Sequence, residues 1–111
     1  MIDSTLEYLY QLHNRGIKLG LENINKILHE CNNPHDKFKS IHLAGTNGKG
    51  STASIIAKIL QNAGQKVGLY TSPHLINFNE RIRINGEPIN NSDIIGFTKT
   101  YRDFFEKHSI T

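Results

Sequence analysis

A cluster of glycines around one lysine is the part of the sequence best suited to chemistry. It reads Gly45-Thr46-Asn47-Gly48-Lys49-Gly50-Ser51. Glycines permit close approach of the backbone, so that N–H groups at the start of a helix can converge on an anion. Lys49 adds a mobile positive charge, and the hydroxyl of Ser51 or Thr52 can face a magnesium ion or the phosphates. These residues predict a phosphate-binding loop.

The loop departs from the general phosphate-loop pattern at two positions. That pattern has a glycine five residues before its Gly-Lys pair and a Ser or Thr directly after it. Leu43 and Gly50 stand at these positions. The residues alone therefore leave two interpretations open: a nucleotide-phosphate site, and a glycine-rich turn that only lets a strand pack closely against a helix.

The elements around the loop are those of a phosphate-binding α/β unit. Residues 40–44 form a short apolar run that favours a strand, and residues 51–63 have helical spacing of isoleucines, ended by Gly64. Residues 66–71 predict a second strand. A strand, a helix and a strand in this order predict a right-handed crossover and a parallel sheet covered by helices.

The remaining segments predict helices and one hairpin. Residues 4–16 and 21–31 show helical periodicity, the first with a capping-box spacing at Ser4 and an apolar face of Leu6, Leu9, Tyr10 and His13. Residues 72–80 are irregular and polar. Asn85-Gly86 predicts a tight hairpin turn between residues 81–84 and 87–89, and a last amphipathic helix begins at about Asn91.

Composition narrows the classes of protein. At 111 residues the chain suits one compact domain, and its net charge of +3 is spread without a basic run, so we expect no nucleic-acid partner. No segment approaches the roughly 20 apolar residues of a membrane span, and the single cysteine, Cys31, cannot form an internal disulfide. We predict a cytoplasmic protein without membrane contact. The histidines lack metal-ligand spacing, so no zinc site is expected.

Three motifs occur together in one family. Besides the loop at residues 45–51, they are the segment 67–75 with its continuation at 78–82, and the lead-in segment 17–21. In order and spacing the chain resembles the folylpolyglutamate/dihydrofolate synthases of the Mur ligase superfamily. The resemblance implies an α/β fold, a P-loop NTPase-like parallel sheet with flanking helices, here incomplete: the N-terminal portion of a Mur-ligase-type ATP-binding domain.

The resemblance also implies a reaction. In this family a phosphoryl group from ATP is placed on a carboxylate of a pteroate or folate, and the amino group of L-glutamate attacks the acyl phosphate to form an amide. ATP and Mg²⁺ are thus the implied cofactors, and ATP, folate or dihydropteroate, and L-glutamate are the implied small-molecule partners. Such chemistry depends mainly on positioning and electrostatics.

Residue roles follow from the same resemblance. Lys49 is the implied catalytic residue, and Ser72 the implied magnesium ligand. Arg81, Leu19 and Gly20 are the implied substrate contacts. ATP phosphates would be bound by Gly45, Thr46, Asn47, Gly48, Lys49, Gly50 and Ser51. From the residues alone, Ser72 also suits a turn before Pro73, and Arg81 a solvated surface charge.

Family members are several hundred residues long, so we expect this chain to be the N-terminal part of the ATP-binding domain and inactive alone. Its expected parts are a helical lead-in (1–36), the strand, loop, helix and strand (37–71), an omega loop with hairpin (72–90), and a helix (91–111). Self-association through uncovered apolar surface is expected. The alternatives are a stand-alone phosphate-binding module and a fragment of a peptidoglycan-precursor Mur ligase.

Overall fold

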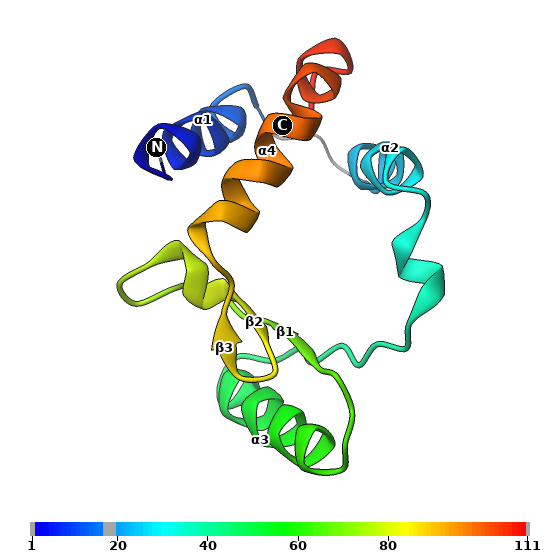
Figure 1. The fold of residues 1–111 in the computed structure, drawn as a ribbon, viewed down its shortest axis with the longest axis vertical. Helices are drawn as coiled ribbons and strands as arrows, with labels where there is room; N and C mark the ends of the chain where they lie inside the picture. Colours follow the sequence, from blue (N-terminus) through cyan, green and yellow to red (C-terminus); the bar gives the residue numbers. More distant parts are fainter. Residues whose placement is uncertain (1, 17–19, 111) are drawn as a thin grey trace. The chain divides into compact units, whose positions relative to one another are not determined.

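The computed structural model describes residues 2–16 and 20–110, which divide into two compact units (Figure 1). One unit comprises the described residues up to 41 together with those from 94 onward, and the other comprises residues 42–93. None of the helices in the described residues is long and apolar enough to cross a membrane.

The first unit is helical and holds the buried core. Its elements are α1 (Ile2–His13), α2 (Glu22–Glu30), the 3₁₀ turn η1 (Pro34–Lys37) and most of α4 (Asn91–Lys107). Tyr8 and Leu12 of α1 pack with Phe105 and with Ile110, which follows α4. Burial of this apolar surface stabilises the unit.

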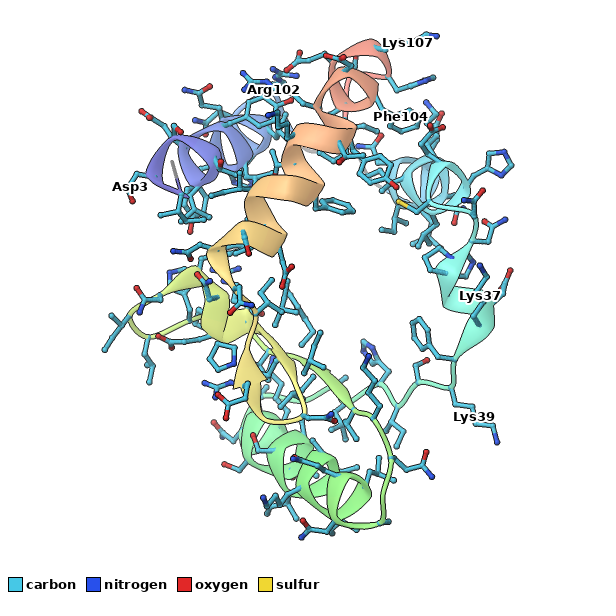
Figure 2. The ribbon with its side chains drawn as sticks, in the orientation of Figure 1. Asp3, Lys37, Lys39, Arg102, Phe104 and Lys107 are labelled. Atoms are coloured by element: carbon cyan, nitrogen blue, oxygen red, sulfur yellow. The ribbon has the colours of Figure 1, made fainter. Side chains whose placement is uncertain are left out.

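The buried face of α1 differs from the expected one. The helix begins at Ile2, so Ser4 lies inside it, while Tyr10 and His13 are exposed. Packing against α4 buries the face of α1 that contains Tyr8 and Leu12. The Tyr8 hydroxyl also donates a hydrogen bond to Glu106 Oε1 at 2.9 Å. The guanidinium of Arg102 on α4 lies 4.0 Å from the centre of the Tyr8 ring, a cation–π contact. The Arg102 side chain is labelled in Figure 2.

The second unit places one helix against a small sheet (Figure 1). Its elements are α3 (Lys49–Asn62), β1 (Gly68–Tyr70), the 3₁₀ turn η2 (Phe78–Arg81), β2 (Ile82–Ile84) and β3 (Glu87–Pro88). Gly64 ends α3 with φ of 89°, as expected for the glycine that follows a helix. The predicted helix, second strand and hairpin are confirmed, with shorter strands.

The sheet is antiparallel, in the order β1–β2–β3. Gly68 pairs with Ile84 and Tyr70 with Ile82, and Arg83 pairs with Pro88 across the hairpin. Asn85 and Gly86 both have positive φ, 50° and 85°, which is the backbone of a two-residue hairpin turn.

The expected strand at 40–44 does not form, and the described residues contain no parallel pair of strands. A strand exists only where a neighbour supplies partners for its N–H and C=O groups. Within the described part of the chain, the three strands pair only with one another, and the segment 40–44 lies outside any helix or strand and is mostly exposed. The described residues contain both helices and a sheet, so the expected α/β class is confirmed.

Candidate phosphate site

The glycine-rich loop leads directly into α3. Gly48 is the residue that caps the helix, and its φ of 78° lies in the left-handed region that favours glycine. No side chain of the described residues caps the helix there. The first turn bond runs from the Thr52 N–H to the Gly48 carbonyl at 2.9 Å. The N–H groups of residues 49–51 therefore have no partner within the helix and can bind an anion.

The side chains of the loop are open to solvent. Every residue from 44 to 52 is exposed, including Thr46, Asn47, Lys49 and Ser51. Among the ion pairs of the described residues, none involves the Lys49 ammonium group. A free ammonium group beside free N–H groups attracts an anion through both its charge and the helix dipole.

Ser72, the predicted metal ligand, follows β1 by two residues and is exposed. It begins the irregular segment that leads to η2, and its peptide bond to Pro73 is cis. Residues 2–16 and 20–110 hold no group of three or more His, Cys, Asp or Glu side chains that could bind a metal ion. The Ser72 side chain can supply one metal ligand, its hydroxyl oxygen.

Arg81, a predicted substrate contact, lies at the end of η2. Its Nε donates a hydrogen bond to His74 Nδ1 at 2.8 Å, and its guanidinium lies 5.3 Å from the centre of the Phe78 ring. The Arg81 side chain is half-buried by this arrangement. It keeps further N–H donors, because a guanidinium has five.

The other two predicted substrate contacts, Leu19 and Gly20, belong to the lead-in segment. Leu19 lies outside the described residues. Gly20 is exposed with φ of 89°, and it belongs to the helical unit, whereas the glycine-rich loop belongs to the second unit.

A depression lies between α3 and the sheet, and sequence reasoning did not indicate it. It has a cavity volume of about 380 Å³. Its lining includes Ser54 and Lys58 of α3, Thr71 after β1, and Arg83 of β2. The two cationic side chains, Lys58 and Arg83, come from segments far apart in the chain, so no local sequence pattern predicts that they lie together.

The sequence prediction also did not include Glu80, which lies in η2. Its carboxylate accepts hydrogen bonds from the backbone N–H groups of Asn77, Leu75 and Ile76, and those bonds lower its pKa below the ordinary value, with that of Asn77 contributing most. The signal was present in the sequence, since Asn77 and Glu80 have the three-residue spacing of a capping box, which the structure contains.

No known family model matches the chain. The chain is 46% identical to the dihydrofolate synthase/folylpolyglutamate synthase of Bacillus subtilis over 78 residues, which cover 70% of this chain and 18% of that enzyme. The crystal structure of folylpolyglutamate synthase from Thermotoga maritima matches with a TM-score of 0.82 and 42% identity, over 94% of this chain and 24% of that one.

A third match is a solved folylpolyglutamate synthase complex with AMPPCP and folate, with a TM-score of 0.81 and 36% identity, over 96% of this chain and 26% of that one. The chain thus has the incomplete α/β fold of a Mur-type ligase domain. Within that class it is related, in sequence and in fold, to the folylpolyglutamate/dihydrofolate synthases, and the resemblance found in the sequence is confirmed. It spans about a fifth to a quarter of the length of these relatives.

Proposed function

We propose that these residues form the ATP-phosphate-binding part of a ligase that joins L-glutamate to folate or dihydropteroate. The observation that carries the proposal is the open helix start at Gly48, with three free N–H groups and Lys49 beside them, in a chain related to such ligases. A related synthase has been solved with AMPPCP and folate together, which supports ATP and folate as ligands.

The proposed reaction has two steps. A carboxylate oxygen of the pteroate or folate attacks the γ-phosphorus of ATP, and ADP leaves. The amino nitrogen of L-glutamate then attacks the acyl carbon, phosphate leaves, and the nitrogen loses a proton. Lys49 and the N–H groups of residues 49–51 would hold the phosphate oxygens and stabilise the charge that develops on them.

Ser72 fits a magnesium site only in part. Mg²⁺ prefers six oxygen ligands and commonly takes several from water and substrate phosphates. The Ser72 hydroxyl would supply one ligand, and ATP and water most of the others. When bound, the ion neutralises phosphate charge. Arg81 would keep its proposed role as a contact for the anionic substrate, and Leu19 and Gly20 theirs at its pterin end.

Binding of AMPPCP to the 111-residue chain, measured by titration calorimetry, tests the proposal. We expect Lys49→Ala to weaken binding at least about tenfold, because one charge-assisted contact to phosphate is worth roughly 1.5–3 kcal/mol. Lys66→Ala is the matched control, since Lys66 is exposed in the same compact unit and lies outside both the loop and the depression. Equal affinity of Lys49→Ala and the unchanged chain contradicts the proposed role.

The same samples test the expected lack of turnover. We expect the 111-residue chain to bind nucleotide without forming an amide from ATP, L-glutamate and dihydropteroate. Amide formation by the pure chain would contradict this expectation. Binding of a UDP-sugar in place of a pteroate would favour the peptidoglycan-precursor ligases.

A further inference from the structure

The segment between Ser72 and Arg81 is held by one carboxylate. Glu80 Oε1 accepts the Leu75 N–H at 3.0 Å, and Oε2 accepts the N–H groups of Ile76 at 3.1 Å and Asn77 at 2.7 Å. The Glu80 N–H in turn donates to the Asn77 carbonyl at 3.0 Å. Three successive N–H groups converge on one anion, so both carboxylate oxygens are occupied by the backbone.

Apolar burial does not hold this segment. Leu75 is 92% exposed and Ile76 is 83% exposed. With so little surface removed from water, the hydrophobic contribution of these two residues is small. The shape of residues 75–77 therefore depends mainly on the hydrogen bonds to Glu80.

The two ends of the segment carry residues of the proposed site. Ser72 begins it, and Arg81 follows Glu80 directly. Near its start, His74 accepts the hydrogen bond from Arg81, and the His74 ring lies edge-on to that of Phe78 with the centres 6.0 Å apart. All of these residues lie in the second compact unit. Fixing the backbone of residues 75–77 thus limits how far Ser72 and Arg81 can move relative to each other.

We propose that Glu80 is a positioning residue, whose carboxylate fixes the backbone of residues 75–77 and thereby holds Ser72 and Arg81 in place for a magnesium-bound nucleotide and an anionic substrate. This inference rests on the proposed function. Glu80 itself touches no ligand in this role, because its oxygens are already bound by N–H groups. An ordered segment lowers the entropic cost of assembling the site.

Glu80→Gln tests the inference, because glutamine has nearly the same shape but only one acceptor oxygen, and its NH₂ group faces donors. The first measurement is amide hydrogen exchange by NMR in the 111-residue chain. We expect exchange at residues 75–77 to become at least about tenfold faster, because the bonds that protect these amides are lost. Glu87→Gln, the same change at an exposed residue of β3, should leave these rates unchanged.

The second measurement is AMPPCP affinity with and without Mg²⁺. We expect Glu80→Gln to keep the affinity seen without Mg²⁺, because the glycine-rich loop is intact, and to lose most of the increase that Mg²⁺ produces. A general loss of structure would lower both affinities. Unchanged exchange at residues 75–77 overturns the inference, and so does faster exchange with the full Mg²⁺ effect. Failure of the unchanged chain to bind AMPPCP contradicts the proposed function instead.

Discussion

At the scale of single residues, the glycine-rich loop contains glycines with different backbone requirements. Gly48 has φ of 78°, whereas Gly50 lies in the first turn of α3 without positive φ. At neither position would an added Cβ meet another atom within 4 Å. Backbone conformation, and not space, therefore separates the two positions.

This difference predicts opposite effects of the same substitution. Gly48→Ala should lower the free energy of unfolding by about 1–2 kcal/mol, the cost of a left-handed conformation for a residue with a Cβ. Gly50→Ala should be neutral or should stabilise the chain by up to about 1 kcal/mol, because alanine favours helix. Urea unfolding followed by circular dichroism measures both. Equal destabilisation by the two changes would contradict the assignment of Gly48 as the strained position.

At the scale of elements, one residue of the hairpin turn, Asn85, makes hydrogen bonds to the residue before β1 and to α3. Asn85 Oδ1 accepts the Val67 N–H at 2.9 Å, and the Asn85 N–H donates to the Val67 carbonyl at 2.8 Å. Gln61 of α3 donates to the Asn85 carbonyl at 3.1 Å. Asparagine suits this position because it tolerates positive φ and also supplies an acceptor.

Two substitutions separate these contributions. Asn85→Gly keeps the positive φ and loses the side-chain acceptor, so we expect a loss of about 1 kcal/mol in unfolding free energy. Asn85→Ala loses the acceptor and also strains the turn, so we expect about 2–3 kcal/mol. Thermal unfolding by calorimetry compares them. A glycine variant less stable than the alanine variant would exclude the turn conformation described for Asn85.

At the scale of the whole molecule, carboxylates that serve as hydrogen-bond acceptors make stability depend on pH. The Arg15 side chain, 2.7 Å from Glu106, and then the Tyr8 hydroxyl hold the pKa of Glu106 below its ordinary value of 4.5. Arg102 acts in the same direction. A carboxyl group with a lowered pKa stabilises the folded state above pH 4.5, and the contribution is lost as the pH falls through the lowered pKa.

The free energy of unfolding should therefore fall as the pH is lowered from 5 towards 3, and it should fall less steeply in Glu106→Gln. Urea unfolding at a series of pH values measures this slope. Glu7→Gln, at an exposed position on α1, is the control and should keep the slope of the unchanged chain. An identical slope in Glu106→Gln would show that the contacts with Arg15 and Tyr8 do not persist in solution.

Apolar surface is also a property of the whole molecule. Ile55 and Ile59 lie one turn apart on α3, and each is 61% exposed. Exposed apolar residues on one face favour contact with other apolar surface. Self-association of the chain, expected from the sequence, stays a prediction.

Several local features of this protein can be predicted from its sequence. Gly48 at the helix start, Gly64 at its end and Asn85-Gly86 in the hairpin are recognisable because each depends on the conformational preference of one or two residues. The family resemblance also came from such short motifs. Asn77 and Glu80 have the spacing of a capping box, although the hydrogen bonds that Glu80 accepts from the Leu75 and Ile76 N–H groups follow from the folded loop.

Strand pairing and helix packing, in contrast, depend on the tertiary fold. The antiparallel order β1–β2–β3, the unpaired state of residues 40–44 and the burial of Tyr8 and Leu12 each depend on which distant segment lies alongside. Strand pairing needs partner backbone groups, and the buried face of a helix is set by its neighbour, so neither can be read from local periodicity. The site divides in the same way: the loop was predictable, whereas the meeting of Arg81 with His74 required the fold.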